Sequence, residues 1–134
     1  MPNDTPPPKS TRKTIVLVDD HKDNLLVLSE ALSQRGYEIH ISTSGAAGLA
    51  LAQKHRADVM IVDIVMPDMS GFEVARRARE KHGAALRLIA LSGYGERNNR
   101  TRSREAGFDC YLLKPVTPDD LIPCIETSRT GRND

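Results

Sequence analysis

The sequence predicts an α/β domain in which a five-stranded parallel, doubly wound sheet is covered by helices on both faces, a three-layer sandwich. Two observations support this fold class. Short runs of β-branched and apolar residues alternate with longer amphipathic stretches along the chain. Parallel neighbouring strands need a crossover of about a dozen residues or more, and those stretches supply it. The length of 134 residues suits one compact core.

Apolar runs predict the strands in order. Residues 14–18 are β-branched and apolar, and residues 59–62 and 86–91 follow the same pattern, which is typical of strands buried on both faces. Residues 38–42 and 110–113 are weaker candidates.

Periodic stretches between these runs predict the helices. In the stretch 24–35, Leu25, Leu28 and Leu32 share one helical side, and a glycine follows as a C-terminal stop. The remaining helices are predicted at 45–54, 71–81, 96–106 and 118–128.

The last predicted helix contains an unusual proline. Thr117 suits a helix cap and Pro118 the first helical position. Pro123 lies beyond the first turn, where proline costs about 3 kcal/mol in a regular helix. We therefore expect this helix to be kinked, shortened or started late at Asp120.

The predicted helix 96–106 has no apolar side chain before Ala106, and its core-facing positions Asn99 and Ser103 are polar. A helix without an apolar stripe gains little from packing. Two interpretations stay open: a marginal helix that takes part in a switch, or simply a solvated helix. Its arginines fit a solvated face or an acidic partner surface: Arg97, Arg100, Arg102 and Arg104.

The two ends of the chain differ in composition from the middle. Residues 1–13 are polar and hold four of the eight prolines, so we expect a flexible leader. The domain is predicted at 14–128 and a short tail at 129–134. No output domain is expected after it, which suits either a single-domain protein or a piece of a longer one.

Composition limits the possible functions. The formal net charge of +1 provides no global attraction to nucleic acid or to an anionic membrane. No apolar run is long enough for a membrane span or a signal peptide, so a cytoplasmic protein is expected. Cys110 and Cys124 lack metal-ligand or redox-motif spacing, and we expect them to be reduced and partly buried.

Polar residues follow four of the five predicted strands. Asp19 and Asp20 end the first and Asp63 ends the third, while Ser92 and Lys114 end the fourth and fifth. One such residue would be explained by a solvated strand end, but this set together predicts a site, because ligands bind at the carboxyl ends of parallel strands. Three close carboxylates repel one another unless a cation offsets them. An all-oxygen acidic site favours Mg²⁺ or Mn²⁺.

With a metal bound, one carboxylate could act as a nucleophile toward phosphorus, as in aspartyl-phosphate intermediates. The transferred group carries charge on its oxygens and needs cationic or hydrogen-bonding partners. Lys114 and the Ser92 hydroxyl would supply them.

These residues resemble the receiver domain of two-component response regulators, over about residues 14–128. The resemblance implies a flavodoxin-like strand order of 2-1-3-4-5. It implies that Asp63 is the phospho-acceptor and that metal is held by Asp19, Asp20, Asp63 and the main-chain carbonyl of Val65. Ser92 matches the switch hydroxyl, Lys114 the family lysine and Tyr111 the aromatic switch position. Gly71 also fits, and the Lys114–Pro115 bond is cis in similar members.

The resemblance further implies a phosphorelay switch rather than a turnover enzyme. Its partners would be a sensor histidine kinase or a histidine phosphotransfer protein, and a downstream protein bound through the fourth helix, fifth strand and fifth helix. The competing interpretations are a metal-dependent aspartate-nucleophile phosphatase, which would need an aspartate where Val65 stands, and a receiver excised from a hybrid kinase. No nucleic-acid motif accompanies the arginines.

Overall fold

A computed structural model describes residues 12–93 and 99–127, apart from the side chain of Asn99. It contains five parallel strands in the order β2-β1-β3-β4-β5, which confirms the predicted fold class and strand order. The strands are β1 (Thr14–Val18), β2 (Glu38–Ser42), β3 (Val59–Asp63), β4 (Arg87–Ser92) and β5 (Cys110–Leu113). The helices are α1 (Lys22–Gln34), α2 (Gly45–His55), α3 (Gly71–His82), α4 (Asn99–Ala106) and α5 (Pro118–Glu126), with a 3₁₀ turn, η2 (Gly83–Ala85), after α3.

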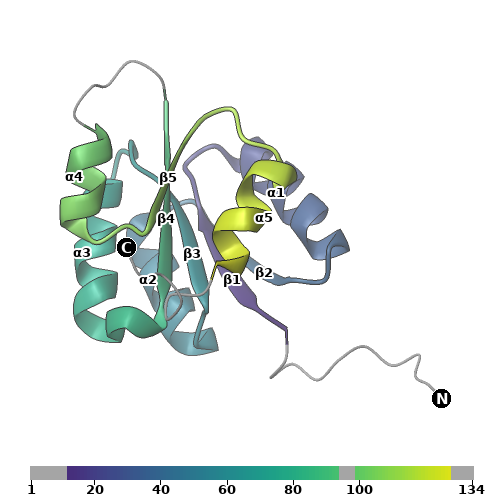
Figure 1. Ribbon diagram of the computed structural model, residues 1–134, viewed down its shortest axis with the longest axis horizontal. Helices are drawn as coiled ribbons and strands as arrows, with labels where there is room; N and C mark the ends of the chain where they lie inside the picture. The colour runs from purple at the N-terminus through teal and green to yellow at the C-terminus, as the bar shows by residue number, and fades with distance from the viewer. Residues whose placement is uncertain (1–11, 94–98, 128–134) are drawn as a thin grey trace.

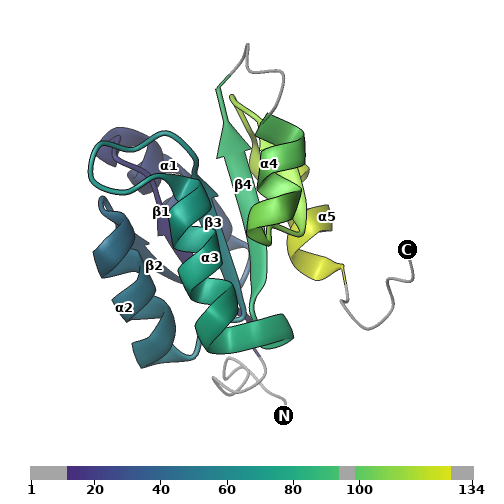
Figure 2. The ribbon, with the colours of Figure 1, turned by 90° about the vertical axis from the view of Figure 1, so that its left-hand side faces the viewer.

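Helices cover both faces of the sheet. α1 and α5 lie on one face, and α2, α3 and α4 lie side by side on the other (Figures 1 and 2). Alternate residues of the central strands point to opposite faces of the sheet and form two apolar clusters, one beneath each helical layer. In β1, for example, Val16 faces α2 and α3, whereas Leu17 faces α1 and α5. Such double burial explains the continuous apolar runs in the sequence.

Local hydrogen bonds define where the helices begin. Ser44 and Ser70 cap α2 and α3 by accepting from the backbone N–H groups of Ala47 and Glu73. Thr117 caps α5 in a reciprocal capping box with Asp120. The capping box holds the first turn of α5, which therefore begins at Pro118 and not at Asp120.

α5 continues through Pro123 and ends at Glu126, where Thr127 is already extended, so the helix is shorter than the predicted 118–128. Pro123 lacks an N–H, yet its own carbonyl accepts a hydrogen bond of 2.6 Å from the Thr127 hydroxyl. A proline removes only one backbone hydrogen bond in so short a helix, so the capping box and the buried Leu121 and Ile125 suffice to hold α5 together.

The fourth helix is described from Asn99 onward, so residues 96–98 of the predicted helix, together with residues 94 and 95, lie outside the described part. No helix within the described ranges has the length and apolar character needed to cross a bilayer.

The cysteines are partly buried as expected, but the expectation that they are reduced was wrong. Cys110 of β5 and Cys124 of α5 form a disulfide, with their Cα atoms 6.4 Å apart. The sequence separation of 14 residues gives no motif, but α5 folds back over β5 and brings the two sulfur atoms together. The disulfide ties the last helix to the edge strand of the sheet.

Candidate functional site

The acidic residues predicted at the strand ends meet in one pocket. Asp19 follows β1 directly and Asp63 is the last residue of β3, and both side chains are almost fully buried. Lys114, which follows β5, places its Nζ 3.1 Å from Asp63 Oδ2 and 3.2 Å from Asp19 Oδ2. The Lys114–Pro115 peptide bond is cis, as the resemblance implied. Residues more than 40 positions apart therefore share one centre because parallel strands end on the same edge.

Burial and charge act against each other in this pocket. Burial raises the pKa of Asp63; the hydrogen bond and charge of Lys114 oppose that rise, and the charge of Asp19 adds to it. Burial alone would lower the pKa of Lys114, but its hydrogen bonds and the charges of Asp63 and Asp19 outweigh burial and raise it. Lys114 is thus firmly protonated, yet one ammonium cannot balance three carboxylates.

Asp20 completes the acidic group at the mouth of the pocket. Its Oδ1 is buried but accepts no hydrogen bond from any described residue, and the His21 ring nitrogen Nδ1 lies 3.4 Å from it. His21 also donates its backbone N–H to Asp19 Oδ1 at 2.9 Å. Buried carboxylate oxygens are normally satisfied, so this oxygen fits an oxygen-binding cation such as Mg²⁺. Side-chain oxygens of Asp19, Asp20 and Asp63 lie close enough for shared coordination.

The loop after β3 wraps the Asp63 carboxylate. The Val65 N–H donates to Asp63 Oδ1 at 3.3 Å, which places the Val65 main chain beside the acidic group while its side chain is exposed. The loop closes where the Gly71 N–H donates to the carbonyl of Ile64 at 2.8 Å. A Cβ at Gly71 would meet the Asp63 carbonyl oxygen at 2.7 Å, so the close approach requires glycine.

The two predicted switch residues lie on neighbouring strands. Ser92 ends β4, is fully buried and donates its hydroxyl to the carbonyl of Gly93 at 3.0 Å. Tyr111 lies in β5, half-buried, with the guanidinium carbon of Arg100 4.7 Å from its ring centre. The main chain joins the region of Ser92 to the lysine, because the Lys114 N–H donates to the Ser92 carbonyl at 2.8 Å.

Apolar residues that the sequence analysis missed border the acidic pocket. A hollow of about 400 Å³ beside Asp19 and Lys114 is also lined by residues of α1, of β4 and of the segment after β5: Asn24, Val27, Leu28, Leu91, Pro115 and Val116. Val27 is 69% exposed, on the side of α1 away from its leucine stripe. An apolar residue on the solvent-facing side of the predicted helix, Val27, was the feature of the sequence that could have indicated an apolar surface next to the site.

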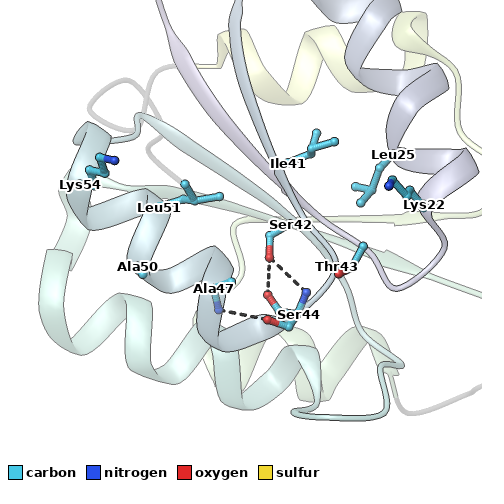
Figure 3. A pocket seen from close by; sticks show the side chains of 10 residues that line it. All are labelled: Lys22, Leu25, Ile41, Ser42, Thr43, Ser44, Ala47, Ala50, Leu51 and Lys54. Atoms are coloured by element: carbon cyan, nitrogen blue, oxygen red, sulfur yellow. Dashed lines mark hydrogen bonds between the residues drawn. The ribbon is translucent and has the colours of Figure 1, made fainter.

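A second hollow, of about 640 Å³, lies at the edge of the sheet formed by β2, where α1 on one face and α2 on the other both contribute to its lining (Figure 3). Its walls carry Leu25, Ile41 and Leu51, with Lys22 and Lys54 on opposite helices. The Ser42 and Ser44 hydroxyls are engaged in local hydrogen bonds there. No carboxylate lines this hollow, so it does not share the chemistry of the acidic pocket.

A family model described as "Response regulator receiver domain" matches residues 15–126. The chain belongs to this family. This match confirms the resemblance seen in the sequence. Receiver domains are the signalling switches of two-component systems rather than turnover enzymes.

Individual receivers show how this domain occurs in other proteins. The virulence sensor protein BvgS of Bordetella pertussis is 36% identical over 87% of this chain, but the chain spans only 10% of that protein. The polar-differentiation response regulator DivK of Brucella anthropi is 27% identical, over 86% of this chain and 94% of its own length. The crystal structure of a CheY-like receiver domain protein from Methanospirillum hungatei superposes with a TM-score of 0.80, at 33% identity and covering 86% of this chain and 91% of that one.

Proposed function

We propose that this receiver domain accepts a phosphoryl group on Asp63 from the phosphohistidine of a sensor histidine kinase or a histidine phosphotransfer protein. The observation that carries the proposal is the Lys114 ammonium held between Asp63 and Asp19, next to the unsatisfied buried oxygen of Asp20. Asp19, Asp20, Asp63 and the Val65 carbonyl would hold Mg²⁺ or Mn²⁺, which would neutralise charge on the phosphoryl oxygens.

The transfer is a nucleophilic substitution at phosphorus. A carboxylate oxygen of Asp63 forms the new O–P bond while the P–N bond to the donor imidazole breaks, and the imidazole takes up the electron pair of that bond. Lys114 is already within 3.1 Å of Asp63 and can turn its N–H groups to the incoming phosphoryl oxygens.

The phosphoryl group then makes contacts that exist only in the phosphorylated state of the domain. The Ser92 hydroxyl leaves the Gly93 carbonyl and donates to a phosphoryl oxygen, and Tyr111 turns inward. Only such state-dependent contacts can shift a conformational equilibrium. The surface formed by α4, β5 and α5 would present this change to a downstream protein partner.

The apolar hollow beside Lys114 supports a protein as the donor. The exposed Val27 of α1 lines this hollow beside Asp19 and Lys114 and would provide an apolar contact for the protein that delivers the phosphohistidine. Whether this domain acts alone or as part of a longer sensor protein affects the donor's identity but not the chemistry at Asp63. A cytoplasmic location remains a prediction.

Incubation with acetyl phosphate and Mg²⁺, followed by intact mass measurement, tests the proposal. The wild-type protein should gain one phosphoryl group, and Asp63→Asn should gain none. Asp23→Asn, an exposed carboxylate on the first turn of α1, serves as the matched control and should be labelled like the wild type. Equal labelling of Asp63→Asn would refute the site.

The metal requirement is tested in the same assay with excess chelator. Labelling should stop in EDTA and return with Mg²⁺, and Asp20→Asn should need a higher Mg²⁺ concentration for half-maximal labelling. Undiminished labelling in EDTA would refute the metal site while leaving Asp63 as the acceptor.

A further inference from the structure

A second group of metal-ligating side chains lies at the amino end of the sheet, away from the acidic pocket. Glu38, His40 and His55 offer one ligand atom each, and these atoms all lie within 4.8 Å of one another. His40 Nε2 is 2.8 Å from Glu38 Oε2, and the rings of His40 and His55 are stacked with their centroids 3.7 Å apart and their planes 10° from parallel.

Two secondary-structure elements bring these residues together. Glu38 and His40 are two positions apart in β2, so their side chains share one face of the edge strand, opposite the face that carries Ile39 and Ile41. His55 is the last residue of α2, which packs on that same face. The side chains of Glu38 and His40 are only 14% and 24% exposed. The partial burial shields both side chains from bulk water, and their contact with each other offsets part of the cost of that burial.

We infer that Glu38, His40 and His55 form a binding site for a zinc-class divalent ion. Two imidazole nitrogens and one carboxylate oxygen are a donor set that Zn²⁺ binds with three protein ligands, leaving a fourth position for water or for a ligand from another molecule. Mg²⁺ prefers oxygen donors alone, so the two sites on this domain differ in metal preference. The carbonyl end of α2 adds negative potential beside His55.

Zinc binding requires the histidine rings to leave their stacked arrangement. The ring-nitrogen lone pairs lie in the ring planes, so nearly parallel rings cannot both point at one ion, whereas Zn–N distances must reach roughly 2.0–2.1 Å. The ion would then link the edge strand β2 to the end of α2. A change in the ring environment of both histidines is therefore a direct signature of the site.

Titration with Zn²⁺ in excess Mg²⁺, which occupies the acidic pocket, tests the inference by calorimetry and by histidine ring NMR. One equivalent of Zn²⁺ should bind, the ring signals of His40 and His55 should shift together, and zinc should raise the unfolding midpoint. His40→Gln and His55→Gln should each weaken zinc binding at least tenfold. His82→Gln, a histidine on α3 outside the cluster, is the matched control and should bind like the wild type.

The acidic pocket provides the competing location for zinc. If His21→Gln removes zinc binding and His40→Gln does not, the ion sits with Asp19 and Asp20 and the inference is wrong. It is also wrong if zinc leaves the ring signals of His40 and His55 unchanged. Far-UV circular dichroism shows that each variant is folded, so failure of acetyl phosphate labelling in the wild type would count against the proposed function alone.

Discussion

Helices α3 and α4 lie next to each other on the same face of the sheet, yet they are held there by different means. α3 buries five residues against the sheet: Gly71, Phe72, Val74, Ala75 and Ala78. Of the residues of α4 whose side chains are described, only Ser103 and Ala106 are buried, and Ser103 Oγ has no hydrogen-bond partner among the described residues. α3 is thus fixed by apolar burial, whereas α4 gains little from it.

Helix α5, on the opposite face, is anchored in a third way. The disulfide joins α5 to β5. Two side-chain pairs, Arg35–Asp119 and Tyr37–Glu126, link α5 to the segment between α1 and β2. Of the three helices, α4 has the weakest attachment, and it belongs to the surface proposed for the downstream partner. Neighbouring helices of this fold can thus be attached to the sheet by very different amounts of apolar burial, so α4 is the helix that we expect to move most easily.

The largest expected effect comes from the apolar anchor of α3. Phe72→Ala removes a buried ring and should lower the free energy of unfolding by about 4 kcal/mol, measured by urea denaturation. The Arg102 guanidinium carbon of α4 lies 4.3 Å from the centre of that ring, so the same change should also loosen α4. Arg104→Ala, an exposed control on α4, should change stability by less than about 0.5 kcal/mol.

Reduction of the disulfide should come next in size. Opening a loop of about 15 residues costs about 3 kcal/mol of stability. Urea denaturation with and without dithiothreitol measures this loss. The double variant Cys110→Ser/Cys124→Ser should be insensitive to the reductant, and an equal urea midpoint for oxidised and reduced wild type would show that α5 does not depend on the bond.

Hydrogen exchange compares α3 and α4 directly. Amides of residues 101–106 should exchange at least tenfold faster than those of the buried part of α3, which corresponds to about 1.4 kcal/mol. Protection of α4 equal to that of β1 would contradict the mobile-helix interpretation and favour a solvated but stable helix.

Ser103 offers a way to strengthen α4. Its Oγ is buried and lacks a partner among the described residues, so Ser103→Ala should raise the unfolding free energy by about 1 kcal/mol. Ser33→Ala, on an exposed position of α1, should have almost no effect. A destabilised Ser103→Ala would mean that this hydroxyl supports the fold.

The smallest effect concerns the pH dependence of the α5 anchor. Burial, together with the hydrogen bond to Glu126 and its charge, raises the pKa of Tyr37 to about 12. The unfolded chain ionises first, near pH 10, so the contribution of Tyr37 is complete below that pH and is lost as the pH rises toward 12. Absorbance titration should show a late tyrosine ionisation that disappears in Tyr37→Phe and moves to lower pH in Glu126→Gln.

The acidic site illustrates how far sequence reasoning reaches. Asp19, Asp63 and Lys114 could be placed together because each follows an apolar run, and parallel strands must end on one edge. The distances that make Lys114 a bridge, and the buried unsatisfied oxygen of Asp20, depend on side-chain packing that no local pattern encodes. Their roles in phosphoryl transfer stay predictions for the labelling experiment.

The first and last residues of the strands and helices were predicted less well than the presence of these elements. Asp63 and Ser92 proved to be the last residues of β3 and β4, each just past the predicted strand end, because ladder hydrogen bonds continue after the apolar run stops. α5 began at Pro118 despite Pro123, since capping and burial outweigh one missing backbone bond.

By itself, the sequence determined the parallel α/β fold, the family and the place where charged groups gather, because hydrophobic periodicity and strand-end residues are local signals. The tertiary structure decided which distant side chains meet. It paired Cys110 with Cys124, stacked His40 on His55 and placed the Arg102 guanidinium over Phe72. Those contacts depend on how helices settle onto the sheet, and that packing is a property of the whole chain.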